Sequence, residues 1–114
     1  MLKKENRLRD RKIFEEVLKK GKTFRTKNLF FKILKSADPN ELKFGFVVSL
    51  KISKKAVKRN KLKRRMREIV RQEIPKLKKG FWGIFLPQRS ALELNFWDLK
   101  KEIVEIFQKA NLYG

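Results

Sequence analysis

The segment 51–71, KISKKAVKRNKLKRRMREIVR, limits the possible folds most strongly, because it combines a helical pattern with very dense charge. Eleven of its 21 residues are Lys or Arg, and Glu68 is its only acid. Its apolar residues recur at helical spacing and form a single stripe, which consists of Leu62, Met66, Ile69 and Val70. Cations packed this densely repel one another unless a polyanion neutralises them. The segment therefore predicts a helix that docks on a hydrophobic core through one face and binds nucleic acid through the other.

A charged segment of this kind can also be an ordinary solvent-exposed helix face. Such faces usually mix the two signs, because acid–base pairs four residues apart support a helix, and this segment holds one acid among eleven cations. The excess charge extends beyond the segment, since the formal net charge of the chain is +20. DNA, RNA and an anionic membrane surface are all partners that this charge would attract.

Length and composition fit one small folded domain, residues 1–114, with 41% apolar residues. No apolar run approaches the roughly 18 residues of a membrane-spanning helix, and the N-terminus lacks the apolar segment of a signal peptide. The absence of cysteine suits a cytoplasmic location. Histidine is also absent, and the 12 acids lack the spacing of a two-metal site. We therefore predict no catalytic residue and no metal site, and we expect the protein alone to be inactive.

Two further helices are predicted from capping residues and apolar periodicity. Residues 1–9 are basic and are expected to be flexible. Asp10 is a suitable N-cap for a helix over residues 10–20, and Asn95 is a suitable N-cap for a final helix that runs to about residue 112. Phe14 lies at the edge of the first helix's apolar stripe, where it either packs into the core or stacks on an unpaired base.

Three segments have the composition of strands. Residues 22–35 are rich in Phe, Ile, Leu and Thr and are expected to bend near Thr26–Asn28. Residues 43–52 alternate, which predicts one buried face made of Phe44, Phe46, Val48, Leu50 and Ile52. These two segments are expected to pair as an antiparallel hairpin. The apolar run 81–87 predicts a strand buried on both faces, which completes a strand–helix–strand unit with parallel strands.

The segment 49–70, SLKISKKAVKRNKLKRRMREIV, closely resembles the signature of the bacterial ribonuclease P protein family. That signature has an Ala-Val pair, then R-N-R, an apolar residue, K-R and a later R-[EQ]. The matching residues here are Ala56, Val57, Arg59, Asn60, Lys61, Leu62, Lys63, Arg64, Arg67 and Glu68. The resemblance extends to the first helix, ENRLRDRKIFEEVLKKGK, and to the order of the later elements. It therefore covers nearly the whole chain.

The resemblance implies an α+β fold, an α/β sandwich with a four-stranded sheet and the order helix–strand–strand–strand–helix–strand–helix. It divides residues 22–35 into two strands near Arg25–Asn28. The family's crossover between parallel strands is left-handed, against the usual right-handed rule.

The implied function is that of the protein subunit of a ribonucleoprotein whose RNA subunit removes the 5′ leader of precursor tRNA. The protein would contribute charge and positioning, and Mg²⁺ would be held mainly by RNA phosphates. The expected partners are the catalytic RNA and precursor tRNA, with no membrane and no obligatory protein partner.

The resemblance assigns the candidate site residues to two groups. The first group would bind the RNA subunit: Lys54, Lys55, Lys58, Arg59, Asn60, Lys61, Lys63, Arg64, Arg67 and Arg71. The second group would hold the leader in a cleft between the first helix and the open sheet face: Arg7, Arg9, Arg11, Phe14, Lys32, Lys43, Ser49 and Lys51.

Three residues depart from the family's pattern. Lys61 replaces the second arginine of R-N-R, which keeps the charge but loses the planar fork that grips phosphate. Leu18 and Lys32 stand where aromatic residues are common, so the cleft shifts towards charge, and Phe14 keeps the first aromatic.

Other functions fit part of the pattern. A ribosomal or general RNA-binding protein has the same charge, but the A-V-x-R-N-x-x-K-R pattern argues against it. A DNA-binding helix would carry more residues that read base edges. A self-sufficient nuclease would need metal ligands that the sequence lacks.

Overall fold

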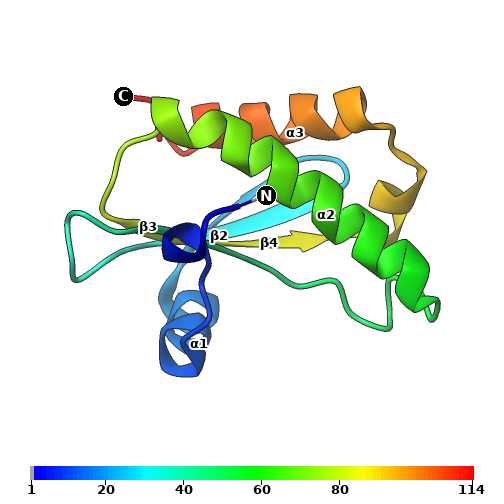
Figure 1. Ribbon diagram of the computed structural model, residues 1–114, viewed down its shortest axis with the longest axis horizontal. Coiled ribbons are helices and arrows are strands. Elements are labelled where there is room, and N and C mark those ends of the chain that lie inside the picture. The colour runs from blue at the N-terminus through cyan, green and yellow to red at the C-terminus, as the bar shows by residue number, and fades with distance from the viewer. Residues whose placement is uncertain (1) are drawn as a thin grey trace.

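The computed structural model describes residues 2–114, which form a mixed sheet with helices on both faces (Figure 1). The elements in chain order are the 3₁₀ turn η1 (Lys4–Asn6), α1 (Arg11–Lys20), β1 (Lys22–Arg25), β2 (Leu29–Lys35), β3 (Leu42–Phe46), α2 (Ala56–Glu73), η2 (Ile74–Lys76), β4 (Phe81–Pro87), η3 (Arg89–Glu93) and α3 (Phe96–Lys109). This order confirms the predicted sequence of helices and strands.

The sheet has four strands in the order β1-β2-β4-β3. β1 and β2 form an antiparallel hairpin, so the predicted division of residues 22–35 is confirmed. The predicted hairpin between 22–35 and 43–52 is wrong, because β4 lies between β2 and β3. β4 is apolar on both faces and so takes a central position, where it pairs antiparallel with β2 and parallel with β3. The hand of the β3-α2-β4 crossover stays a prediction.

One face of the sheet is covered by α2 and α3, which lie side by side above it in Figure 1. The apolar stripe predicted for α2 is fully confirmed, since its members are buried: Leu62, Met66, Ile69 and Val70. An aromatic cluster fills the centre of this layer. The ring of Phe31 lies 4.4 Å from that of Phe85 and 5.9 Å from that of Phe107, between centroids. Most of the hydrophobic core is therefore on this face.

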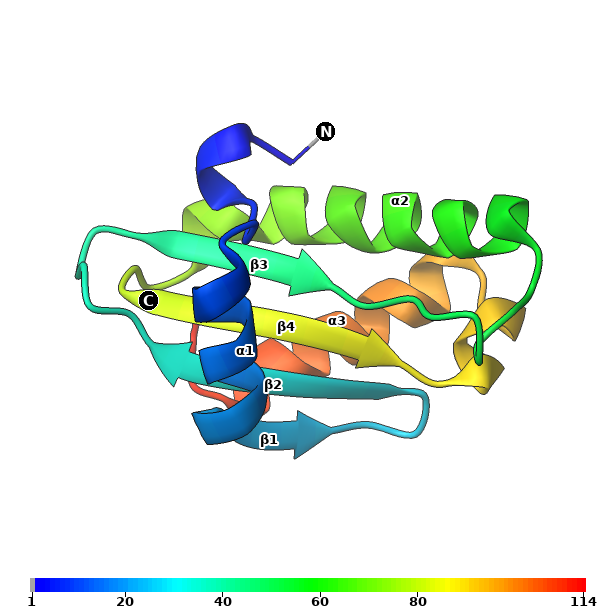
Figure 2. The same cartoon turned by 90° about the horizontal axis from the view of Figure 1, so that it is seen from below.

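Within residues 2–114, α1 is the helix on the opposite face and crosses the strands (Figure 2), and Leu8 of the N-terminal segment packs there beside it. Asp10 caps the helix as predicted, because its Oδ1 accepts hydrogen bonds from the backbone N–H groups of Lys12 and Ile13. The Phe14 ring lies so close to Gly45 of β3 that a Cβ there would stand 2.6 Å from it. Glycine at this position therefore lets α1 approach the sheet, and it places the Phe14 ring on the edge strand.

The N-terminal segment is packed over residues 2–9, whereas residue 1 of the segment expected to be flexible lies outside the described residues. Its flexibility stays a prediction. Leu2 is 1% exposed and Leu8 is 6% exposed. The backbone N–H of Leu8 donates to the carbonyl of Phe44, and Arg7 forms an isolated parallel bridge with Phe44. The two leucines anchor the segment to the molecule. Lys3 and Lys4 between them are exposed, while Arg7 is partly buried and donates from Nε to the carbonyl oxygen of Leu2 at 2.9 Å.

β3 is shorter than the strand predicted for residues 43–52. It ends at Phe46, and Leu50, predicted to face the core, is 67% exposed. The parallel register places Pro87 of β4 opposite position 48, and proline has no N–H to extend the ladder. Val47 still donates its N–H to the carbonyl of Phe85, and residues 48–55 then leave the sheet and form the loop that leads into α2.

Candidate nucleic-acid interface

The outward face of α2 carries most of the residues predicted to bind the RNA subunit. Lys54, Lys55, Lys58, Asn60, Lys61, Arg64 and Arg71 are exposed, and Arg59, Lys63 and Arg67 are partly buried. The N-cap residue of α2, Lys55, makes no side-chain cap. The free backbone N–H groups in the first turn of α2 therefore favour an anion. The helix start and its cations together form a surface suited to phosphates.

Arg59 also has a structural role at the start of α2. Its Nη1 donates to the carbonyl oxygen of Ser53 at 2.8 Å, which ties the helix to the preceding loop. Asn60, by contrast, has no hydrogen bond from its side chain to any residue of the described range 2–114. The side chain of Asn60 is therefore free to meet RNA, whereas Arg59 in part organises the loop.

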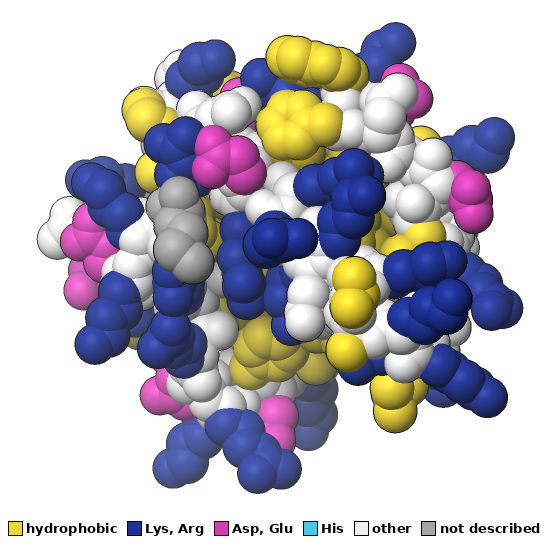
Figure 3. All heavy atoms as spheres, turned by 45° about the vertical axis from the view of Figure 1, so that its right-hand side comes forward, with side chains coloured by type: hydrophobic (Ala, Val, Ile, Leu, Met, Phe, Trp, Pro, Cys, Tyr) yellow, Lys and Arg dark blue, Asp and Glu magenta, His cyan; other side chains and the backbone are white. Residues whose placement is uncertain are grey.

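Figure 3 shows the end of the molecule where α2 and α3 begin. Lys and Arg side chains are spread over this face, with only scattered Asp and Glu among them. Such a field attracts nucleic acid without regard to its sequence.

Arg7, Arg9 and Arg67 form a second cationic site, which we call the arginine cluster. They line a small cavity of about 140 Å³ between the N-terminal segment, α2 and β3. The pKa of Arg67 is lowered, first by burial and then by repulsion from Arg7 and Arg9. Within residues 2–114, no carboxylate pairs with any of the three. Unneutralised cations gathered in this way are suited to bind phosphate oxygens.

An aromatic ring adjoins the arginine cluster. Phe14 lines the same cavity, together with Gly45 and Phe46 of β3. The Phe14 side chain is partly buried, so its ring packs on Gly45 and still reaches the cavity. A ring beside cations is the usual arrangement for binding single-stranded nucleic acid, because bases stack while phosphates are neutralised.

The structure places the other residues of the predicted leader group elsewhere. Lys32 lies on β2, and its Nζ donates to the carbonyl oxygen of Leu18 at 2.8 Å, which holds the end of α1 on the sheet. Arg11 is exposed and pairs with Glu15, and Lys43 pairs with Glu41. Ser49 and Lys51 are exposed in the loop after β3. The predicted group is therefore not a single site, and Arg7, Arg9 and Phe14 are its members at the cavity.

The family resemblance assigns Arg67 to the residues that bind the RNA subunit. In the structure Arg67 lies on α2, beside Arg7 and Arg9. Helical periodicity does predict that Arg67 points away from the hydrophobic core on which α2 packs. What it does not show is that Leu2 and Leu8 pin the N-terminal segment beside this turn of the helix.

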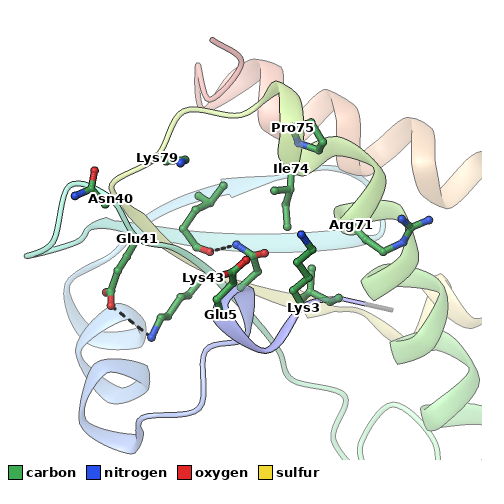
Figure 4. Close-up of a pocket in the computed structure, with 12 residues that line it drawn as sticks. Lys3, Glu5, Asn40, Glu41, Lys43, Arg71, Ile74, Pro75 and Lys79 are labelled. Carbon is green, nitrogen blue, oxygen red and sulfur yellow. Dashed lines mark hydrogen bonds and ion pairs between the residues drawn. The ribbon is translucent and has the colours of Figure 1, made fainter.

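A larger hollow of about 760 Å³ lies on the other side of the N-terminal segment (Figure 4). Its charged side chains are of both signs: Lys3, Glu5, Glu41, Lys43, Arg71 and Lys79. Two of its cations are neutralised, because Lys43 lies 3.5 Å from Glu41 and Arg71 forms an ion pair with Glu68. This hollow is therefore a weaker candidate for phosphate binding than the arginine cluster.

Across residues 2–114, no group of three or more His, Cys, Asp or Glu residues is placed to hold a metal ion. In the same range, no helix is long and apolar enough to cross a membrane.

Fold and surface define the class: this is a small, basic α+β protein whose cationic surface is suited to nucleic acid. The sequence model of the family described as Ribonuclease P matches residues 2–111. The chain therefore belongs to the ribonuclease P protein family. As a member it is a protein component of ribonuclease P, an endoribonuclease of tRNA processing, and it is a partner of the RNase P RNA.

Named relatives and solved structures agree with this assignment. The chain is 38% identical to the ribonuclease P protein component of a Pseudanabaena species, over 98% of this chain and 97% of the relative. It is 34% identical to that of Microcystis aeruginosa, over 94% and 92% of the two chains. The RNase P protein from Thermotoga maritima is 30% identical, with a TM-score of 0.80 over 90% of this chain and 96% of that one. The Staphylococcus aureus RNase P protein, at 20% identity, shares the fold with a TM-score of 0.87, over 97% of this chain and all of the other.

Proposed function

We propose that the protein binds the RNase P RNA through the start of α2 and holds the 5′ leader of precursor tRNA at the arginine cluster. The observation that carries the second part is that Arg7, Arg9 and Arg67 converge on a cavity that Phe14 also lines. Among the described residues 2–114, no acid pairs with these arginines. A single strand that crosses this cavity meets charge for its phosphates and a ring for a base.

The two parts of the surface do different work in this proposal. The exposed cations from Lys54 to Arg64 form a broad field, in which single members are largely interchangeable. The arginine cluster is compact, and each guanidinium can grip one phosphate through two parallel bonds. Arg67 lies on α2 itself, so it connects the RNA-subunit surface to the leader site.

The protein acts on the reaction by neutralising phosphates and fixing the position of the leader. Correct positioning of the leader lowers the activation barrier of the cleavage step that the RNA subunit carries out. The cut itself is assigned to the RNA subunit, with Mg²⁺ held mainly by RNA phosphates. We place this assembly in the cytoplasm, with no obligatory further protein.

Affinity for precursor and mature tRNA, measured with the reconstituted holoenzyme, tests the leader site. Arg9→Ala and Arg67→Ala should each weaken binding of a precursor that carries a leader by about 1.5–3 kcal/mol, the range for a lost bond to a charged group. Binding of mature tRNA should change little. Each variant should also reduce the slope of log affinity against log salt by about one unit.

Arg89→Ala is the matched control, because Arg89 is an exposed arginine on η3, away from the cavity. It should leave the difference between precursor and mature tRNA unchanged. Equal losses for the two tRNAs in Arg9→Ala and Arg67→Ala would refute the leader site. Co-purification of ribosomal RNA in place of the RNase P RNA would favour the alternative of a general RNA-binding protein.

A second test concerns the protein on its own. Purified protein with Mg²⁺ and precursor tRNA should give no cleavage until the RNA subunit is added. Turnover without that RNA, after strict removal of contaminating nucleases, would contradict the assignment of the chemistry to the RNA.

A further inference from the structure

Trp97 is the largest side chain among the apolar residues that the described range leaves in solvent, with 71% of its surface exposed. It lies in the first turn of α3, two residues after the N-cap Asn95. A single exposed apolar side chain needs no explanation by itself. The residues around this indole are what point to a ligand. Trp97 lies outside the signature segment of α2.

The indole is held in place by its neighbours. The ring of Phe96 stands edge-on to it, with 5.4 Å between centroids and an angle of 85°. The ammonium of Lys100 lies over it, 5.7 Å from the centroid. That ammonium also donates to Oε1 of Gln72 on α2, at 3.2 Å. A ring fixed before binding loses little conformational freedom when a ligand stacks on it.

Trp97 also lies where α2 and α3 meet, so the cations of α2 are close by. Arg65 of α2 donates from Nη1 to the carbonyl oxygen of Leu94, just before α3, at 3.1 Å. Lys101 is exposed one helical turn after Trp97. Figure 3 shows apolar side chains at the top of this face, with Lys and Arg side chains and a few Asp or Glu side chains near them. A polyanion seated on α2 therefore passes beside an open aromatic ring.

We propose that Trp97 is a stacking platform for an unpaired base of the RNase P RNA, at the margin of the surface formed by α2. The proposal rests on the proposed function, and it extends the RNA contact to α3. One face of the ring carries the Lys100 cation, which can meet a phosphate, and the wide exposure of the indole leaves room for a base.

Charge favours RNA over a protein partner at this position. A second copy of the chain would bring another net charge of +20 against the cations around Trp97. The exposed indole is also far smaller than the roughly 1,200 Å² or more that a stable protein interface buries. A base needs only the area of the ring.

The affinity of Trp97 variants for the RNase P RNA of the same source, measured at several salt concentrations, tests the proposal. Trp97→Ala should weaken binding about tenfold, the scale of one lost base stack. Trp97→Leu should lose about as much, because it keeps an apolar side chain without a π-face, and Trp97→Phe should retain most of the affinity. The salt slope should stay the same in all three, because no phosphate contact is removed.

Indole fluorescence gives a second, direct readout. The chain has two tryptophans, and Trp82 is only 7% exposed. Quenching by acrylamide therefore reports mainly on Trp97, and binding of the RNA should protect the indole from it. Circular dichroism on each variant shows whether the fold is kept.

The outcomes separate this inference from the function on which it rests. Wild-type affinity for Trp97→Ala would overturn the platform and leave the proposed function intact. Equal losses of affinity for folded Trp97→Phe and Trp97→Ala would also overturn the platform, because a base can stack on a phenyl ring as well as on an indole. A wild-type protein that does not bind the RNase P RNA would refute the proposed function itself. Self-association that Trp97→Ala removes would assign the ring to a protein contact.

Discussion

The two faces of the sheet are packed to very different degrees. On the side of α2 and α3, 19 buried apolar residues of the described chain form one cluster around the rings of Phe31, Phe85 and Phe107. On the side of α1, four buried residues form the corresponding cluster: Leu8, Val17, Trp82 and Ile84. The first face therefore supplies most of the stability, since buried apolar area is its main source.

The thinly packed face is the one that adjoins the arginine cluster. One helix covers it, and the cavity lined by Arg7, Arg9, Arg67 and Phe14 opens where α1, β3 and the N-terminal segment meet. A cation that lacks a paired acid costs stability at such a place, and burial and repulsion already lower the pKa of Arg67. The α2/α3 side therefore holds most of the fold together, while the α1 side leaves room for the leader site proposed above.

The largest effect should come from a direct test of this difference. Phe31→Ala should lower the free energy of unfolding by about 3–5 kcal/mol, because its ring is fully buried in the larger cluster. Phe14→Ala should cost clearly less, since that ring is only partly buried. Urea unfolding followed by circular dichroism measures both changes.

Phe31→Leu is the milder variant if Phe31→Ala does not fold, because total stability is only about 5–15 kcal/mol. Similar losses for Phe14→Ala and Phe31→Ala would break the comparison. They would mean that the α1 side stabilises the protein as much as the other side does.

Much of this arrangement could be predicted because single elements carry their own pattern. The stripe from Leu62 to Val70 and the apolar run 81–87 each require burial on known faces, whatever else the chain does. Asp10 and Asn95 cap the helices as their chemistry predicts. The break in residues 22–35 came from the family resemblance, since periodicity only indicated a bend.

The errors concern relations between elements, which local pattern does not fix. Nothing in residues 43–52 shows that β4 will lie between them and β2. The loss of alternation after Phe46 depends on Pro87, some 40 residues later in the chain. The arginine cluster depends on the burial of Leu2 and Leu8. Two isolated leucines in a basic segment form no periodic apolar pattern, so the sequence does not indicate that this segment packs.

The next effect sharpens the comparison from the α2 side. Asn60→Ala should weaken binding of the RNase P RNA by about 1.5–3 kcal/mol, because Asn60 is exposed and can both donate to and accept from RNA. The free energy of unfolding should not change. A loss of affinity in Arg59→Ala is harder to assign to RNA contact alone, because the variant also loses the hydrogen bond to the Ser53 carbonyl.

Arg71→Ala is the comparison variant and should cost less affinity. Arg71 donates two hydrogen bonds to Glu68, at 2.9 and 2.5 Å. The bond from Arg71 is the main reason that the pKa of Glu68 is lowered to about 2, so the pair stays charged at neutral pH. Filter binding at one salt concentration compares the variants. Equal losses for Asn60→Ala and Arg71→Ala would mean that α2 acts only as a diffuse field of charge.

A third prediction tests the α1 side for function. Phe14→Ala should weaken binding of a precursor tRNA by about 1–3 kcal/mol, the range for one lost base stack, and should leave mature tRNA unaffected. Phe14→Leu keeps most of the packing on Gly45 but loses the ring, so it should show the same selective loss. Recovery of precursor binding in Phe14→Leu would mean that the ring serves packing alone, and so would equal losses for the two tRNAs.

The smallest effect concerns the C-terminal contact on the α2/α3 side. The hydroxyl of Tyr113 donates to Oε1 of Glu73, a carboxylate that is only 4% exposed, at 2.7 Å. Tyr113→Phe removes this bond and should lower the free energy of unfolding by about 0.5–1.5 kcal/mol at neutral pH. RNA affinity should be unchanged.

The same contact predicts how the stability difference varies with pH. Burial, and then the bond to Glu73, raise the pKa of Tyr113 above its ordinary value of about 10. Above that pH the unfolded chain loses the phenol proton while the folded chain keeps it, so the folded state loses stability as pH rises. The advantage of the wild type over Tyr113→Phe should therefore be complete below about pH 9 and shrink from about pH 10 upwards. Tyr113 is the only tyrosine, so tyrosinate absorbance in the folded protein follows this group directly. An ordinary titration near pH 10, or a stability difference that does not vary with pH, would show that Glu73 does not hold the phenol.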